Sequence, residues 1–384
     1  MHPSTPPPQT DLFIAGAGPA GLACAIAAAL RGISVQVADG MTPPIDKACG
    51  EGLMPDTLAA LTELGVDVST AISAIFTGIR FHGTPDARGA STIAQASFPS
   101  TNGRGIKRLL LHQLLLDRAI ELGVRFHWQT VVQGIEGATI RTNRGTLHSR
   151  YIVGADGHQS RVRTWAGLDR SASRFFQPVR RIGLRQHFAI APWTSHVEVY
   201  WSHEGQAYVT PISSSEICVA FVASRKFSSV HQALSHFPQL QSRLAAAPPS
   251  DAPRGSITLS RRLHRVTRDN VALIGDASGS VDAVTGEGLA LCFRQALALA
   301  SALQANDLAQ YQRAHTALRR PPHLMAFALL SLDSSPRLRA CVFTVLERRP
   351  RLFQHMLELH IGHRPLRLFG DHGLLSTGLS LLAG

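Results

Sequence analysis

Residues 12–39 read LFIAGAGPAGLACAIAAALRGISVQVAD, and this stretch decides the fold of the chain. An apolar run is followed by a glycine-rich turn, an alanine-rich stretch, a second apolar run and an acid, which is the pattern of a strand, a helix and a second strand. The glycines have the spacing G-x-G-x-x-G, which in this context is typical of a dinucleotide-binding unit. The segment therefore predicts an α/β protein with a Rossmann-like, parallel sheet.

Each position of the glycine turn has its own physical role. Gly16 permits the tight turn, Gly18 lets a pyrophosphate approach the backbone, and Gly21 lets the helix pack on the strand. Ala20 lies at the start of that helix, whose free N–H groups attract phosphate. Asp39 closes the second strand at the spacing of an acid that accepts hydrogen bonds from the adenosine ribose, which favours FAD or NAD over a nucleotide with a 2′-phosphate.

Composition limits the class of protein. The chain has 384 residues, of which 45% are hydrophobic, enough for two or three lobes with a sizeable core. A net charge of +12 suits nucleic acid, an anionic membrane or phosphorylated ligands, but the arginines are scattered and no nucleic-acid motif is present, so we expect no nucleic-acid binding. The five cysteines are widely spread and lack Cys-x-x-Cys spacing, so we expect reduced thiols and no metal site.

Two later segments place an acid after an apolar strand. Residues 152–163 read IVGADGHQSRVR, and residues 271–276 read VALIGD and precede a long apolar-faced helix. The order and spacing of the three segments resemble the FAD-dependent monooxygenases of the para-hydroxybenzoate hydroxylase type, and also the geranylgeranyl reductases and flavin halogenases of the same superfamily. The resemblance covers residues 12–305.

This resemblance implies cofactors and contacts. It implies that Asp276 binds the ribityl chain of FAD and that Asp156 and Gly157 lie near the pyrophosphate and the route of NAD(P)H. Arg108 begins a helix that matches the family's Arg-x-x-Leu segment and is a candidate for a flavin contact. FAD and NAD(P)H are therefore the expected cofactors.

The tetrapeptide Gly-Glu-Gly-Leu occurs twice, in ACGEGLMP (48–55) and in TGEGLAL (285–291). No fixed period links the copies, so they are not a duplication. Their glycines allow the backbone to lie close to a planar ligand, and the helix start after the second copy can stabilise charge on reduced flavin by roughly 0.3–1 kcal/mol. We predict that both loops meet at the flavin ring. The glycines concerned are Gly50, Gly52, Gly286 and Gly288.

Three residues of these loops are candidates for chemistry. Glu51 and Glu287 can act as acid or base if burial raises the pKa, although an acid near a helix start also stabilises the helix without any catalytic role. Cys49 with Gly50 matches a Cys-Gly pair that lies beside the isoalloxazine ring in the resembling reductases. Cys49 is either a reactive thiol or a small, polarisable wall of the pocket.

The middle and the end of the chain differ in pattern. Residues 179–223 alternate apolar and polar positions, which predicts an antiparallel sheet, and the resemblance places the substrate pocket on it. The pattern leaves open which side chains face inward; the candidates are Arg185, His187, Tyr200, Tyr208 and Pro211. From residue 307 the pattern is helical, and residues 319–384 carry nine arginines against four acids. This end is a lid, a dimer face or a surface for peripheral contact with an anionic membrane.

The predicted architecture is a Rossmann-like FAD-binding domain, an antiparallel β-sheet substrate domain and a helical C-terminal region. The segments are a disordered leader (1–10), the FAD-binding domain (11–75, 101–177 and 256–315), the substrate domain (76–100 and 178–255) and the helical region (316–384). The first ten residues lack the apolar stretch of a signal peptide, so we expect a cytoplasmic protein with peripheral membrane contact through its last helices.

The motifs predict an FAD-dependent oxidoreductase, and the leading interpretation of its reaction is a monooxygenase, with a reductase as the alternative. The Ala-Asp-Gly segment favours a monooxygenase, in which NAD(P)H reduces the flavin and a C4a-hydroperoxide hydroxylates a small lipophilic substrate, aromatic or polyketide-like. Cys49-Gly50 favours a reductase of activated or isoprenoid C=C bonds, although the Tyr-x-Trp-x-Phe-Pro pattern of that family is missing. A halogenase, whose Trp-x-Trp-x-Ile-Pro segment is absent, and a non-catalytic lipid-binding flavoprotein are minor alternatives.

Overall fold

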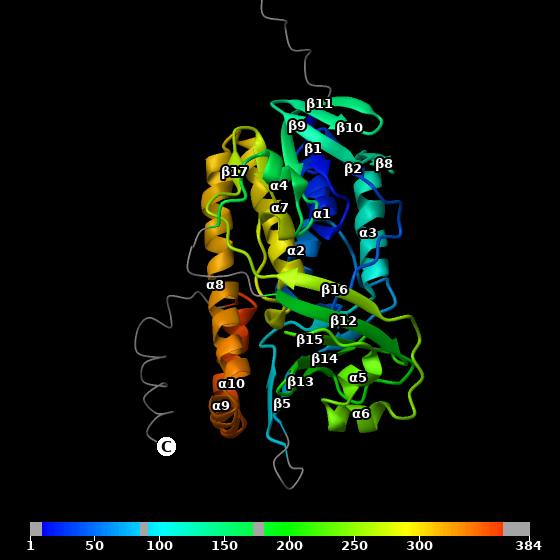
Figure 1. Ribbon diagram of the computed structural model, residues 1–384, viewed down its shortest axis with the longest axis vertical. Coiled ribbons are helices and arrows are strands. Elements are labelled where there is room, and N and C mark those ends of the chain that lie inside the picture. The colour runs from blue at the N-terminus through cyan, green and yellow to red at the C-terminus, as the bar shows by residue number, and fades with distance from the viewer. Residues whose placement is uncertain (1–9, 85–90, 172–179, 364–384) are drawn as a thin grey trace, which may run out of the picture.

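Two sheets lie one above the other, and a long helix, α8 (Leu308–Ser334), runs beside both of them (Figure 1). The computed structural model describes residues 10–84, 91–171 and 180–363. The predicted leader, except for Thr10, and the last residues of the predicted helical region (364–384) lie outside the described residues.

The upper sheet is the predicted dinucleotide-binding sheet. Its strand order is β17-β18-β11-β1-β2-β8, with β9 and β10 attached beside β11. Strand β1 pairs in parallel with β11 and with β2. The pairs β2 with β8 and β11 with β18 are also parallel. The strands are β1 (Thr10–Ala15), β2 (Val35–Asp39), β8 (Arg125–Trp128), β9 (Val132–Glu136), β10 (Thr139–Thr142), β11 (Gly145–Gly154), β17 (Thr267–Arg268) and β18 (Val271–Leu273).

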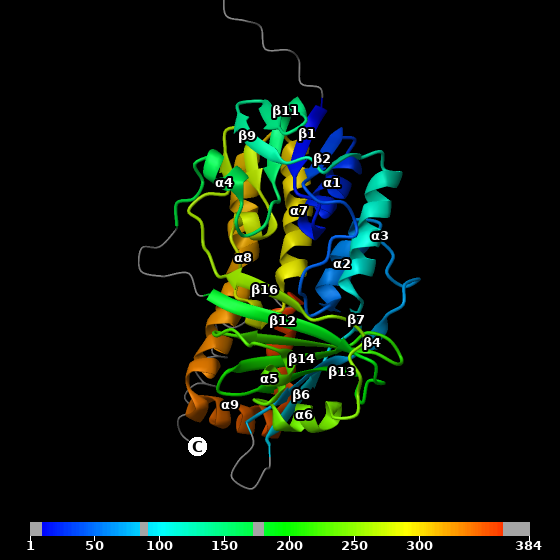
Figure 2. The same cartoon turned by 45° about the vertical axis from the view of Figure 1, so that its right-hand side comes forward.

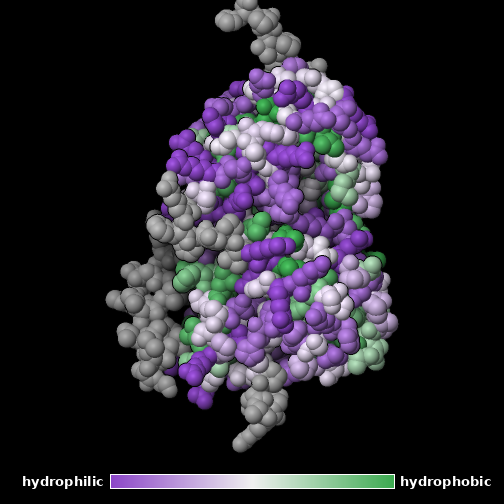
Figure 3. Space-filling view, viewed as in Figure 1, coloured by the Kyte–Doolittle hydropathy of each residue, from purple (hydrophilic) through white to green (hydrophobic). Residues whose placement is uncertain are grey.

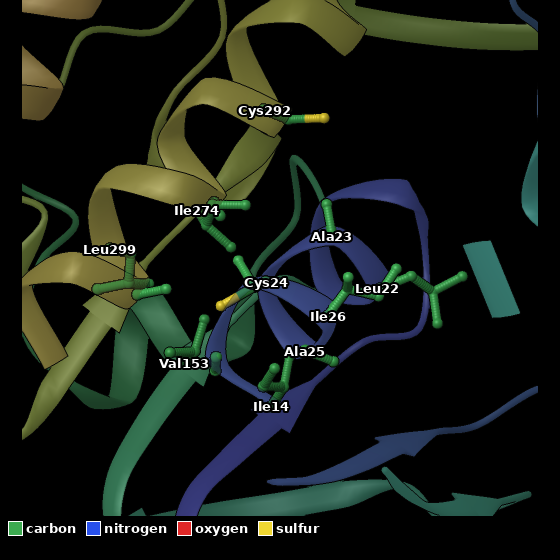
Figure 4. Packing of buried hydrophobic residues seen from close by; sticks show 14 of the residues in the cluster. Ile14, Leu22, Ala23, Cys24, Ala25, Ile26, Val153, Ile274, Cys292 and Leu299 are labelled. Carbon is green, nitrogen blue, oxygen red and sulfur yellow. The ribbon is translucent and has the colours of Figure 1, made fainter. Parts of the chain in front are cut away.

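The central strands β1 and β2 are largely apolar and buried on both faces, and apolar helices pack on this sheet. Helix α1 (Pro19–Ala29) lies against α7 (Gly288–Gln304), although the two are far apart in sequence. Figure 4 shows Cys24 of α1 among Val153, Ile274 and Leu299. The other helices of this half are α2 (Pro55–Glu63), α3 (Arg108–Glu121) and α4 (Arg161–Trp165), with the short turns η1 (Gly275–Ser278) and η2 (Ala283–Thr285).

The lower sheet has seven strands in the order β16-β12-β15-β14-β13-β5-β6, and all its pairs are antiparallel except β13 with β5. The alternation seen in residues 179–223 is therefore confirmed as an antiparallel sheet. Short helices α5 (Val230–Leu234) and α6 (Pro238–Leu244) cover its outer face (Figure 2). The strands are β5 (Gly78–His82), β6 (Ile93–Ser97), β12 (Arg180–Phe188), β13 (His196–Trp201), β14 (Gly205–Pro211), β15 (Ile217–Ala223) and β16 (Arg254–Leu259).

A small third sheet, β3 (Gly52–Leu53), β7 (Gly103–Gly105) and β4 (Ala74–Phe76), connects the two halves. It starts inside the first Gly-Glu-Gly-Leu loop and packs on the lower sheet. A Cβ atom at Gly105 would lie 1.7 Å from the carbonyl oxygen of Pro211, so only glycine allows this contact. The loop is thereby fixed between the two sheets.

The C-terminal helices α9 (Pro336–Arg348) and α10 (Pro350–His360) pack against β6 of the lower sheet, and α8 contacts both of them. Phe343 of α9 and Phe353 of α10 form an aromatic cluster with Phe81 and Trp201 of the sheet. No helix in the described part of the chain combines the length and the apolar character needed to cross a bilayer. The face in Figure 3 is mostly hydrophilic, with apolar residues in small groups.

Candidate active site

A long cleft of about 940 Å³ extends from the upper sheet to the lower sheet. Its upper end is lined by the glycine turn and by the acids Asp39, Asp156 and Asp276. Its lower end is apolar and is enclosed between β5 and β13 on one side and α8 and α10 on the other. The apolar lining includes Ile79, Phe81, Val197, Val199, Trp201, Met325, Leu329, Phe353, Met356 and Leu357. We call this lower end the apolar chamber.

The glycine turn has the geometry that its sequence predicts. Gly16 has φ of +108°, and a Cβ atom at Gly21 would lie 1.9 Å from the Gly16 carbonyl oxygen, so neither position tolerates a side chain. A Cβ atom at Gly18 would meet nothing within 4 Å, because Gly18 faces the cleft. Helix α1 begins there without a side-chain cap, which leaves its first N–H groups to a phosphate.

Asp39 lies at the end of β2 and lines the cleft, as predicted for a residue near the ribose. Its Oδ2 accepts a hydrogen bond from the Ala17 N–H at 2.8 Å, and its Oδ1 accepts one from the Met41 N–H at 2.8 Å. From the other side, a ring nitrogen of His112 on α3 lies 3.0 Å from the Ala17 carbonyl oxygen. Asp39 and His112 therefore hold the glycine turn in place in addition to any ligand contact.

Arg108 is the first residue of α3, and its side chain is 8% exposed and lines the cleft. The guanidinium Nε has no hydrogen-bond partner among the described residues. A buried cationic donor without a partner is costly, so this position fits an anionic or carbonyl-bearing group in the cleft. Arg108 therefore lies in the cleft, and its contact with the flavin stays a prediction.

Asp276 lies in η1 at the edge of the cleft, where its Oδ2 is 3.2 Å from Lys47 Nζ, a neighbour that sequence reasoning missed. The loop is braced from α8. His315 Nε2 lies 2.9 Å from the Ser278 hydroxyl, and Arg319 donates to the Ser278 carbonyl at 3.0 Å. Burial lowers the pKa of His315 to about 3, so this imidazole is neutral and structural.

Asp156 and Gly157 also line the cleft, at the start of α4. Asp156 Oδ2 accepts hydrogen bonds from the Arg161 and Val162 N–H groups at 2.8 and 3.2 Å, so the carboxylate stabilises the start of that helix. Gly157 has φ of +79°, which favours glycine at this turn. The route of NAD(P)H past these residues stays a prediction.

The first Gly-Glu-Gly-Leu loop carries Cys49 into the wall of the cleft. Its sulfur accepts a hydrogen bond from the Glu51 N–H at 3.4 Å, and burial raises the pKa of the thiol. A raised pKa disfavours the nucleophilic thiolate. The geometry therefore favours the second interpretation of Cys49, a small wall of the pocket.

Glu51, a predicted candidate for catalysis, is 2% exposed and both its oxygens are engaged. Oε1 accepts a hydrogen bond from the Arg108 N–H at 3.0 Å, at the start of α3, and Oε2 lies 2.6 Å from His187 Nε2. His187 Nδ1 in turn lies 2.8 Å from Asp251 Oδ2. Burial acts to lower the pKa of His187, but the hydrogen bond and charge of Glu51 raise it overall.

This network ties the Cys49 loop to β12. Arg185 of β12 pairs with Asp46 at 3.1 Å and with Glu51 at 3.7 Å, so two cations meet the carboxylates of the loop. Ligand-type atoms of Glu51, His187 and Cys218 lie within 4.8 Å of one another, but Glu51 and His187 are bound to each other. The arrangement is that of a structural anchor for the loop.

Glu287, in the second Gly-Glu-Gly-Leu loop, is 4% exposed and lines the cleft. It is the N-cap residue of α7, yet its side chain makes no capping hydrogen bond. Burial, together with the charge of Asp56, raises the pKa of Glu287 to about 8. His360 of α10 faces this carboxyl, with its Nδ1 3.6 Å from Glu287 Oε2. The flanking Gly286 and Gly288 face open space, which leaves room for a close ligand.

Comparison with known proteins decides the family. Residues 9–310 match the family described as an FAD binding domain. The chain belongs to this FAD-binding family. It is an FAD-dependent oxidoreductase, and the predicted superfamily and fold class are confirmed. The features of the upper cleft fit FAD: an uncapped helix start, glycines that face the cleft, and a guanidinium nitrogen without a partner among the described residues.

Relatives of this FAD-binding protein include a reductase and a hydroxylase. The chain is 26% identical to the menaquinone reductase of Mycolicibacterium smegmatis over 345 residues, which covers 84% of this chain and 83% of the relative. It is also 26% identical to the ubiquinone hydroxylase UbiL of Rhodospirillum rubrum over 361 residues, 83% of this chain and 80% of the relative. A flavoprotein/dehydrogenase from Cytophaga hutchinsonii shares the fold, with a TM-score of 0.76, 18% identity and coverage of 92% and 93% of the two chains.

Some residues of the site escaped sequence reasoning. Of the sheet candidates, Arg185 and Tyr208 line the cleft, whereas Tyr200 lies on the opposite face of β13, where its hydroxyl donates to Glu198 at 2.6 Å. The apolar chamber is closed by α8 and α10, which bring Met325, Phe353 and His360 to the cleft. Only the amphipathic spacing of the tail signalled a buried face, and it did not say what that face covers.

Proposed function

We propose that this FAD-dependent oxidoreductase is a reductase that adds hydrogen across an activated or isoprenoid C=C bond of a lipophilic substrate, with NAD(P)H as the source of electrons. The observation that supports this most directly is Glu287. Because the pKa of its carboxyl is raised to about 8, it carries a proton at neutral pH at the junction of the cleft and the apolar chamber. Saturation of a double bond needs a hydride and a proton, and a neutral carboxylic acid supplies the proton.

Reduced FAD, when bound, supplies the hydride for this reaction. The first turn of α1 and the glycine turn would hold its pyrophosphate, Asp39 its adenosine end and Asp276 its ribityl chain. Arg108 offers its free Nε to the same cleft. The Cys49 loop, fixed by Glu51 and its partners, forms the wall on the side of the lower sheet.

The apolar chamber supports a substrate of lipid character. Its lining is made of aliphatic, aromatic and methionine side chains from the lower sheet and the C-terminal helices. Each methylene group buried there contributes about 0.8 kcal/mol to binding, so a chain of a few isoprene units is held without polar contacts. The similarity to a menaquinone reductase and to a ubiquinone hydroxylase supports an isoprenoid quinone or a related lipid.

The second candidate is the monooxygenase that the Ala-Asp-Gly segment favours. Asp156 and Gly157, which the resemblance places near the route of NAD(P)H, line the cleft, and the apolar lining of the chamber suits the lipophilic substrate of such an enzyme. The similarity to a hydroxylase supports it as well. We favour reduction because saturation of a C=C bond consumes one proton for each hydride at the substrate carbon, and Glu287 lies in the same cleft as the apolar chamber.

One experiment separates the two reactions. Flavin-loaded protein is incubated with NADPH and a menaquinone, once without oxygen and once under isotopically labelled oxygen, and the products are examined by mass spectrometry. The reductase predicts a product that retains two added hydrogens in both conditions after any hydroquinone has been reoxidised in air to the quinone, and that carries no label. A labelled product formed only in oxygen would establish the monooxygenase instead.

We also propose that the outer face of the C-terminal helices contacts an anionic membrane, from which a lipid can reach the chamber. Phe327 is 69% exposed and Leu324 and Leu338 are half exposed, with Arg320 and Arg337 exposed beside them. Helix α8 presents Met325 and Leu329 to the chamber from the same turns. Flotation with anionic vesicles should be reduced by Phe327→Ser, and equal flotation with neutral vesicles contradicts the electrostatic part of the proposal.

A further inference from the structure

Two buried polar atoms face each other in the wall of the cleft and have no hydrogen-bond partner in the described part of the chain. They are Glu287 Oε2 and His360 Nδ1, which lie 3.6 Å apart. Both residues line the cleft, where it meets the apolar chamber. Buried polar groups are almost always hydrogen-bonded, so a pair of unpartnered atoms in the wall of one cavity needs a partner or a function.

The charged groups around this pair do not neutralise Glu287. Arg294 of α7 directs its guanidinium to Asp56 of α2, at 3.1 Å, so the nearest cation is already paired. Burial and the charge of Asp56 raise the pKa of Glu287 to about 8, and burial lowers the pKa of His360 to about 4. At neutral pH the carboxyl therefore holds a proton and the imidazole is neutral.

The tautomer of His360 completes the arrangement. The ring is hydrogen-bonded to the backbone of Thr285, an interaction that raises its pKa and is therefore made by a ring N–H to the carbonyl. Nδ1 is the ring nitrogen without a partner in the described part of the chain, so a tautomer with its N–H at Nε2 would leave the Nδ1 lone pair free to accept a hydrogen bond from the carboxyl of Glu287. A small approach of the two side chains makes an O–H to N hydrogen bond.

We propose that Glu287 and His360 form the proton-delivery pair of the reductase, with Glu287 as the catalytic acid and His360 as the residue that positions and reprotonates it. This inference rests on the proposed function. A hydride adds to one carbon of the C=C bond, and the Glu287 proton adds to the other, which leaves a carboxylate. A solvent proton that passes through His360 restores the acid, so the net change is the addition of one hydride and one proton to the substrate.

The first test needs no substrate. Infrared difference spectra of the flavin-loaded protein should show the C=O stretch of a protonated carboxylic acid at pH 7, and this band should disappear as the pH rises through about 8. Glu287→Gln should remove the band, and Glu63→Gln, which changes an exposed glutamate at the end of α2, should retain it. His360→Asn should shift the pH at which the band disappears.

The second test separates the half-reactions. Glu287→Gln should slow menaquinone reduction by roughly 10²–10⁴-fold, the usual contribution of a general acid, and should slow reduction of the flavin by NADPH much less. His360→Asn should slow repeated turnovers more than the first one. The pH profile of wild-type turnover should fall above about pH 8, and this fall should be absent from the residual activity of Glu287→Gln.

Failure of the pair and failure of the function are distinguishable. A wild-type protein that reduces menaquinone but shows no carboxylic acid band at pH 7, or a folded Glu287→Gln variant that retains full turnover, overturns the pair and leaves the reductase standing. A wild-type protein that forms only oxygenated product overturns the reductase and this role together. The infrared titration is made on the wild-type protein, so it decides the protonation state even if a variant fails to fold.

Discussion

Replacement of Glu51 by glutamine tests whether this residue anchors the loop or takes part in catalysis. Glutamine retains the shape and can still accept from the Arg108 N–H, but it removes the charge that faces His187 and Arg185. Removing one member of a buried ion-pair network costs roughly 3–5 kcal/mol, and the retained hydrogen bond places this change near the lower value, about 3 kcal/mol. With a shift of about 2–4 °C per kcal/mol, the melting temperature should fall by roughly 6–12 °C.

The assay is thermal unfolding followed by circular dichroism and by flavin absorbance, with Glu63→Gln as the exposed control. The loop that carries Cys49 and Gly50 should loosen with the network, so flavin release should precede global unfolding in Glu51→Gln. The pH profile of the residual activity should keep its wild-type shape, because Glu51 donates no proton to the substrate. An unchanged melting temperature combined with a large loss of turnover would refute the anchor and make Glu51 a catalytic residue.

Three further predictions follow from the same geometry. Gly21→Ala should abolish FAD binding, seen as purified protein without flavin absorbance, because its Cβ would lie 1.9 Å from the Gly16 carbonyl oxygen; a variant that retains yellow colour contradicts the role of the turn. Because the pKa of His187 is raised in the folded protein, its pairing stabilises the fold below about pH 6.5, its unfolded pKa, and this contribution is lost as the pH rises through the folded pKa. The difference in urea stability between wild type and His187→Gln should therefore shrink as the pH rises, and a constant difference argues against a charged imidazole. Met356→Trp should fill part of the apolar chamber and raise KM for long-chain substrates more than for short-chain ones, and equal effects on both would place the lipid chain elsewhere.

The sequence predicted what is decided locally. The strand, turn and helix around Gly16 and the acid at Asp39 depend on residues close together in the chain, and so does the alternation that became β12 to β15. These features gave the fold class, the FAD-binding lobe and the family. Whether Tyr200 or Val199 faces the cleft depends on which side of the sheet is covered by α10, and no local pattern contains that information.

The roles of the two glutamates show the same limit. Their helix-start positions were visible in the sequence, but the partners of Glu51 lie 57 and 136 residues away, at Arg108 and His187. Glu51 accepts a hydrogen bond from the first residue of α3, whereas the helix that follows Glu51 in the sequence is α2. Glu287 meets His360 only because the C-terminal helices fold back onto the cleft. A role that depends on contacts between residues far apart in the sequence can be recognised only from the three-dimensional structure.

The position of α8 has a consequence for how such enzymes diversify. The first part of this helix braces the cofactor loop through His315 and Arg319, whereas Met325 and the helices after it form the outer wall of the apolar chamber. The segment after Arg319 therefore carries two things at once, the lining of the apolar chamber and the His360 that faces Glu287. A foreign terminal segment joined at that point changes the lipid that is accepted and keeps the chemistry only if it also brings a histidine to Glu287.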